Sequence, residues 1–79
     1  MVIFSEHSLE KMRERHISRE RVIRVLERGR RVPSYAGRQA ARGVVDDIDT
    51  EVIFFVRDDG TIIVITTYDE LGSEWRPVV

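Results

Sequence analysis

Two apolar runs in the second half of the chain constrain its fold more than any other feature. Residues 52–56 read Val-Ile-Phe-Phe-Val, and residues 62–65 read Ile-Ile-Val-Ile. β-Branched and aromatic residues favour strands, and uninterrupted runs of them indicate strands covered on at least part of both faces. Between the runs, Asp58-Asp59-Gly60 is typical of a hairpin turn, because glycine and aspartate accept positive φ. The sequence therefore predicts a hairpin with strands over roughly Glu51–Arg57 and Thr61–Tyr68.

The first half of the chain predicts two helices and one further strand. Ser5 and Ser18 precede the helical segments as N-cap residues, and Gly29 follows the second segment where a glycine commonly stops a helix. The expected elements are a β-prone run at Val2–Phe4, helices over about Glu6–Arg15 and Arg19–Arg28, a loop or irregular edge over Arg30–Gly37, a strand over roughly Arg38–Asp46 and a turn at Asp46–Asp49.

Length and composition limit the class of protein. With 79 residues the chain is expected to form one domain over residues 1–70, followed by a tail at 71–79 that contains Trp75. It has no cysteine, and its two histidines, His7 and His16, lack the spacing of a metal site, so we expect no disulfide, metal or cofactor. No apolar run approaches the roughly 20 residues of a membrane span, and the first residues do not resemble a signal peptide, so the expected location is the cytoplasm.

Charge is divided unevenly along the chain. Residues 1–43 carry 11 basic and five acidic side chains, a net charge of +6, whereas residues 44–79 carry two basic and nine acidic side chains, a net charge of −7. Such a division is typical of a chain that binds a polyanion, or of one whose halves neutralise each other. Twelve of the 13 basic residues are arginine, whose planar fork of donors suits phosphate and carboxylate.

Several basic residues recur at spacings that place them on one side of an element. His7, Lys11 and Arg15 follow one another every four residues along the first expected helix. Arg38 and Arg42 are four apart on an expected strand, where a period of two gives them the same face. If the two sets adjoin, they form a positive concavity suited to a phosphodiester. The alternative is a solvated helix whose glutamates pair with these cations, with little effect on stability.

The pattern F-S-x-H-x-x-x-x-M-x-x-R-x-I-S at Phe4–Ser18, together with the strand ending Val64–Tyr68, carries a family resemblance. Over roughly residues 2–69 the chain resembles a small bacterial and archaeal domain family without an assigned function. That family is similar to a distant branch of the RelE/ParE/BrnT toxin superfamily. The resemblance implies an α+β fold of order β-α-α-β-β-β, with an antiparallel sheet and a two-helix hairpin packed on one of its faces.

The same resemblance implies an activity and a set of residues. RelE-like toxins cleave RNA without a metal ion, so a toxin-like endoribonuclease or RNA-binding protein is expected, with an antitoxin-like protein as a partner. The family pattern matches His7, Arg15 and Tyr68, which are the expected catalytic residues. The residues expected to hold RNA phosphates are Lys11, Arg38 and Arg42.

Two other functions are consistent with the sequence. The first is a non-catalytic interaction module that forms a homodimer or binds a partner through its sheet and the tail around Trp75, since aromatic residues dominate interface energetics. The second is RNA binding without cleavage, for which affinity would depend strongly on salt.

Overall fold

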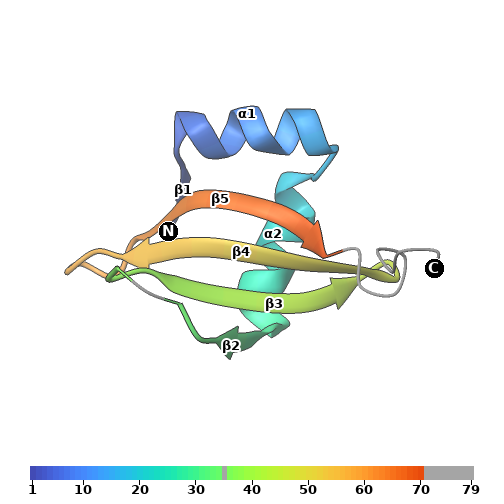
Figure 1. Cartoon of the computed structure of the whole chain (residues 1–79). Coiled ribbons are helices and arrows are strands. Elements are labelled where there is room, and N and C mark those ends of the chain that lie inside the picture. Colours follow the sequence, from blue (N-terminus) through green and yellow to red (C-terminus); the bar gives the residue numbers. More distant parts are fainter. Residues whose placement is uncertain (35, 71–79) are drawn as a thin grey trace.

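A computed structural model describes residues 1–34 and 36–70 and shows an α+β fold with two helices and a five-stranded sheet (Figure 1). The expected tail at 71–79, including Trp75, lies outside the described residues. The elements are β1 (Val2–Phe4), α1 (Glu6–Arg15), α2 (Arg19–Arg28), β2 (Arg30–Val32), β3 (Gln39–Val45), β4 (Ile48–Val56) and β5 (Ile62–Glu70). Their order in the sheet is β1-β5-β4-β3-β2.

The sheet is mixed, which corrects the expected antiparallel sheet. The pairs β2–β3, β3–β4 and β4–β5 are antiparallel, but β1 runs parallel to β5, with Val2 opposite Ile62 and Phe4 opposite Val64. After β1 the chain forms the two helices and then strands β2, β3 and β4. It returns as β5, which lies beside β1. The segment expected to be a loop or irregular edge begins with a short edge strand, β2.

The turns shift two strand boundaries. Asp46 and Asp47 have φ values of 53° and 66° and form the whole turn between β3 and β4, so the expected turn at Asp46–Asp49 is too long. Two residues with positive φ give a hairpin turn whose twist matches that of the strands. In the β4–β5 turn the backbone N–H of Thr61 donates to the carboxylate of Asp59 at 2.9 Å. This bond, followed by the Thr61 hydroxyl, holds the pKa of Asp59 below its ordinary value.

Both helices begin and end where the sequence predicts. The Oγ atoms of Ser5 and Ser18 accept the backbone N–H groups of Ser8 and Arg21 at 3.0 and 3.1 Å. These bonds satisfy donors that a helix start leaves unpaired. Gly29 ends α2 for a reason other than a left-handed turn, since its φ is −71°. A Cβ there would lie 2.5 Å from the Val25 carbonyl oxygen and 2.7 Å from that of Arg42, so only glycine lets α2 approach β3 this closely.

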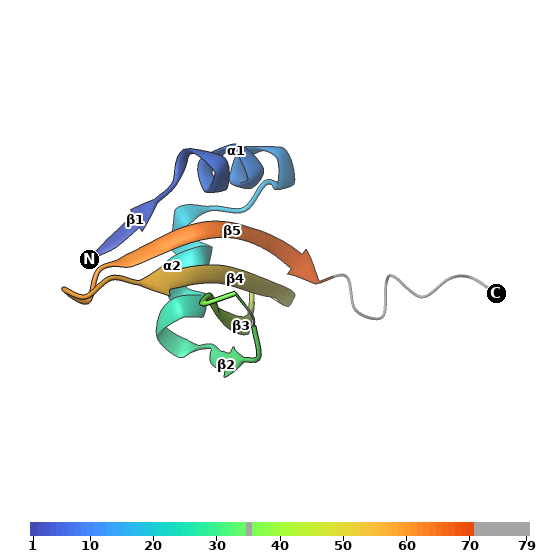
Figure 2. The same ribbon diagram turned by 60° about the vertical axis from the view of Figure 1, so that its left-hand side comes forward.

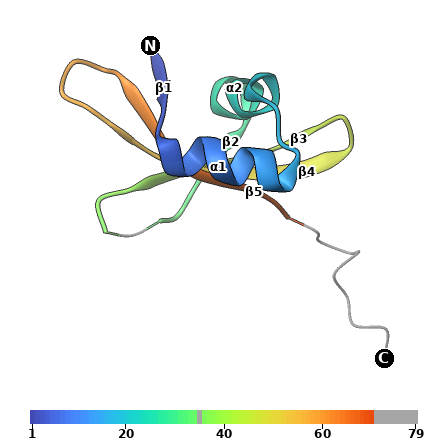
Figure 3. The ribbon, with the colours of Figure 1, turned by 90° about the horizontal axis from the view of Figure 1, so that it is seen from above.

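The two helices contact different strands of the sheet: α1 packs against β5, and α2 packs against β3 and β4. α1 runs along β5 at the edge of the sheet, and α2 crosses the back of the sheet in a different direction (Figures 1 and 2). Seen from above, α1 lies over β5 while α2 lies to one side of the sheet (Figure 3). His16, which ends α1, has φ 57°, and the buried Ile17 follows it in the link. The link therefore redirects the chain and contributes to the core.

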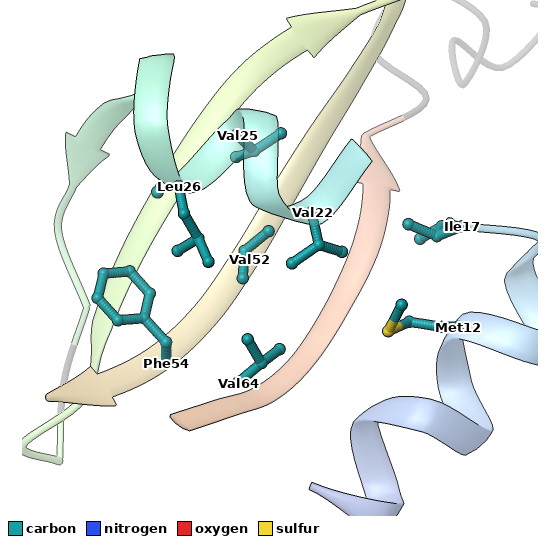
Figure 4. Close-up of a cluster of buried hydrophobic side chains, with 9 residues drawn as sticks. Met12, Ile17, Val22, Val25, Leu26, Val52, Phe54 and Val64 are labelled. Atoms are coloured by element: carbon teal, nitrogen blue, oxygen red, sulfur yellow. The ribbon is translucent and has the colours of Figure 1, made fainter. Parts of the chain in front are cut away.

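The core lies between α2, the inner edge of α1 and one face of the sheet (Figure 4). Fully buried side chains from α2 and the central strands meet there, and Met12 and Ile17 close the side next to α1. The core residues are Met12, Ile17, Val22, Val25, Leu26, Ala41, Val52, Phe54 and Val64. Neither described helix is long and apolar enough to cross a membrane. Among the described residues, both helices leave the opposite face of the sheet uncovered (Figures 1 and 3).

We expect Gly29→Ala to destabilise the protein by about 1–3 kcal/mol, because the added methyl group meets two backbone carbonyls that cannot move independently. Urea unfolding measures this change. Gly37→Ala is the matched control: it has φ 73° and open space around the new Cβ, so only backbone strain of about 1–2 kcal/mol is expected. Unchanged stability of Gly29→Ala would contradict the close contact of α2 with β3.

Candidate functional site

Four polar residues lie in register across the uncovered face of the sheet. Arg30 of β2 is opposite Arg42 of β3, Arg42 is opposite Glu51 of β4, and Glu51 is opposite Tyr68 of β5. Side chains alternate along a strand, and the neighbours of Glu51, Thr50 and Val52, are fully buried against the helical side. Glu51 and its cross-strand partners therefore lie on the opposite face. We call these four residues the polar row.

Hydrogen bonds fix the side chains of Arg42, Glu51 and Tyr68 in the polar row. The Tyr68 hydroxyl donates to Glu51 Oε2 at 2.7 Å. Arg42 donates through Nε and Nη2 to the carboxylate of Asp49, at 3.1 and 2.8 Å, and both side chains remain about one-third exposed. A two-point arginine–carboxylate contact fixes orientation as well as distance. The row thus presents an ordered carboxylate, a phenol and a guanidinium on a surface that solvent reaches.

Arg15 approaches the same end of the sheet from α1. β1 pairs only with residues 62–64 of β5, so the later part of β5 has no strand on that side among the described residues. There Arg15 Nη1 donates to the carbonyl oxygen of Thr67 at 2.8 Å, beside Tyr68 in the chain. This contact uses one of the five N–H donors of the guanidinium. Arg15 therefore reaches the edge of β5 beside Tyr68, while Arg42 lies two strands away on β3, in register with Glu51.

The other three expected site residues lie elsewhere. His7 is exposed in the first turn of α1, eight residues and therefore about 12 Å along the helix from Arg15. Lys11 pairs with Glu14 at 3.3 Å. Arg38 is exposed in the loop before β3, which begins at Gln39, so it does not share a strand face with Arg42. His7, Lys11 and Arg15 extend too far along α1 to form one site with the polar row.

Sequence reasoning missed Glu51, Asp49 and Arg30. Glu51 was expected at the start of a strand. Adjacent strand residues point to opposite faces, so a buried Val52 indicates that Glu51 faces away from the core. Its position opposite Arg42 and Tyr68 depends on strand register, which no local signal in the chain gives.

A second polar cluster lies on the helical side and has a structural role. Arg21 Nη1 donates to both carboxylate oxygens of Asp69 at 3.2 Å, and the Thr50 hydroxyl donates to the same carboxylate at 2.8 Å. This network ties α2 to β4 and β5. The polar row, in contrast, lies on the face of the sheet that solvent reaches.

The polar row offers groups for proton transfer and for holding an anion. A carboxylate such as that of Glu51 accepts protons, a phenol such as that of Tyr68 donates one, and arginines bind phosphate oxygens. In the described part of the chain, no three side chains of histidine, aspartate or glutamate gather closely enough to hold a metal ion.

The Arg42–Asp49 pair should stabilise the protein more than a surface ion pair does. A double-mutant cycle with Arg42→Ala and Asp49→Ala is expected to give a coupling free energy of about 1 kcal/mol. The same cycle on Lys11 and Glu14, an exposed pair within α1, is expected to give less than about 0.5 kcal/mol. Equal coupling in the two cycles would show that Arg42 is not held in a fixed orientation.

The fold and this geometry can be compared with known proteins. Residues 4–69 match the family model described as Domain of unknown function (DUF4258). A comparison with curated proteins gave no match. The match covers nearly all of the described residues and confirms the expected membership of an uncharacterised domain family, while the similarity to RelE-like toxins stays a prediction. The chain therefore belongs to the DUF4258 family.

Proposed function

We propose that this protein binds single RNA strands on the uncovered face of its sheet and cleaves them at the polar row. The observation that supports this proposal is the alignment of Arg42, Glu51 and Tyr68 across three neighbouring strands. Strands lie about 4.8 Å apart, so the three backbones span about 10 Å, a distance that one nucleotide and its two flanking phosphates can cover. The resemblance to RelE-like toxins supports the same activity.

The groups of the row match the steps of RNA cleavage by its own 2′-hydroxyl. Glu51 takes the proton of the 2′-hydroxyl as O2′ forms a bond to phosphorus. The bond from phosphorus to O5′ breaks, Tyr68 gives O5′ a proton, and the proton held by Glu51 then returns to Tyr68 along the hydrogen bond between them. Arg42 and Arg15 stabilise the charge on the phosphate oxygens. The products are a 2′,3′-cyclic phosphate and a 5′-hydroxyl, and the RNA supplies the nucleophile.

An apolar row on the same face adds a surface for bases. Ile3, Ile63 and Phe55 lie in register across β1, β5 and β4, and Ile3 and Phe55 are each 38% exposed. We call these three residues the apolar row. Bases of single-stranded RNA stack on aromatic side chains exposed on a sheet face. Phe55 is four residues along β4 from Glu51, about 13 Å, which is about two nucleotides.

The test is cleavage of a single-stranded RNA oligonucleotide of mixed sequence, with chelator present. We expect products that end in 2′,3′-cyclic phosphate, and no cleavage of the same sequence made as DNA, which lacks the 2′-hydroxyl. Glu51→Gln should slow cleavage by about 100-fold or more, because it removes the proton acceptor and keeps the shape. Glu14→Gln, an exposed change on α1, should have no effect.

Thermal unfolding of both variants shows whether they fold like the wild type. Intact RNA after incubation with the wild-type protein, or wild-type cleavage by folded Glu51→Gln, would contradict the proposal.

A second candidate function, self-association, is favoured by the exposure of the apolar row. A second copy that covers Ile3 and Phe55 would bury an apolar surface that a monomer leaves in water. In that case the wild type sediments as a dimer at micromolar concentration and Phe55→Asp sediments as a monomer. A wild-type monomer over the whole concentration range would exclude this function.

A further inference from the structure

The outer edge of β3 is partly unpaired. The first residue of β2, Arg30, lies opposite Arg42, so in the described residues no strand lies beside Gly43–Val45 on that side. In a two-residue hairpin the residues that flank the turn bond to each other, and the backbone groups of alternate residues point outward. The N–H and C=O of Val44 therefore point toward this open edge.

A notch of about 230 Å³ lies where the edge of β3 faces the end of α2. Gly29 and Gly43 close one end of it, because a Cβ on Gly43 would lie 3.2 Å from the Cα of Gly29. The residues that line it are Arg24, Val25, Arg28, Gly29, Gly43, Val44, Val45 and Asp46. The notch is therefore open toward the β3–β4 turn and ends blindly between two glycines.

Two arginines give the notch a positive charge. Arg24 and Arg28 are exposed and one helical turn apart, and within the described part of the chain their side chains form no ion pair or hydrogen bond. Asp46, at the end near the turn, is the one carboxylate among the lining residues. The lining has a net charge of +1, and Arg28 is adjacent to the closed end because it precedes Gly29.

The geometry points to a binding site for the carboxyl terminus of a partner polypeptide. Its last two or three residues extend along Gly43–Val45 as an added strand, and its terminal carboxylate meets Arg28 at the closed end, with Arg24 one helical turn further along the notch. An open strand edge provides backbone hydrogen bonds, a blind end suits a chain that stops, and an arginine fork matches a carboxylate. Val45, whose side chain lies on the helical side of β3, provides an apolar contact, which favours small aliphatic side chains in the peptide.

This site is independent of the proposed cleavage of RNA. It is formed by α2 and the outer edge of β3, and it shares no residue with the polar row. A protein that leaves RNA intact could still bind a chain end here.

The test is a synthetic array of hexapeptides of varied sequence with free carboxyl termini, probed with the intact protein. We expect binding to a subset ending in small aliphatic residues. Fluorescence anisotropy of these peptides in solution should then show at least about tenfold weaker binding when the terminus is amidated, because the carboxylate charge is gone. Arg28→Ala should weaken binding equally, whereas Arg13→Ala, an exposed change on α1, should leave it unchanged.

Three results would overturn the proposal. They are an array with no bound peptide, equal binding of free and amidated peptides, and displacement by inorganic phosphate at the peptide's own concentration, which would indicate a site for small anions. Arg28→Ala and Arg13→Ala both replace exposed side chains, so a shared thermal unfolding midpoint excludes misfolding as the cause of a difference.

Discussion

The alternation of side chains along β4 is the constraint on which the rest of the structure depends. Thr50, Val52 and Phe54 are fully buried beneath the helices, and the residues between them occupy the opposite face. A slip of one residue would move Glu51 into the core. Two ten-residue helices cover one face of a five-stranded sheet, and α1 extends along its edge. The described residues thus leave the second face of the sheet, with both the polar and the apolar row, to solvent or a partner.

Local chemistry determined what could be predicted from the sequence. The caps at Ser5 and Ser18 and the Asp-Gly turn before Thr61 act over a few residues, so the helix bounds and the hairpin were foreseen. The parallel pairing of β1 with β5 joins segments about 60 residues apart and has no local signal. Prediction of the polar row requires the register between strands, and the register of β4 with β5 shifts between Ile53 and Phe54. Helical periodicity predicts that His7 and Arg15 share one side of α1, but it places them eight residues apart along the helix.

The structure also explains much of the charge division between the two halves of the chain. Arg21 and Arg42 from the basic half bind Asp69 and Asp49 from the acidic half. Further arginines stack on rings, with the guanidinium carbon of Arg31 lying 4.9 Å from the centre of the Phe54 ring. These contacts fix α2, β2 and β3 against the central strands. The cations left at the surface include Arg24 and Arg28, which line the notch beside β3.

We propose the uncovered face of the sheet as the functional surface, and NMR can locate that surface directly. Backbone amide NMR spectra recorded while a short single-stranded RNA is added would report which residues it contacts. If RNA binds this face, we expect chemical-shift changes concentrated at Glu51, Phe55 and Tyr68, with the amides of α2 unchanged. Shifts confined to α2, or no shifts at millimolar RNA, would contradict RNA binding on the uncovered face.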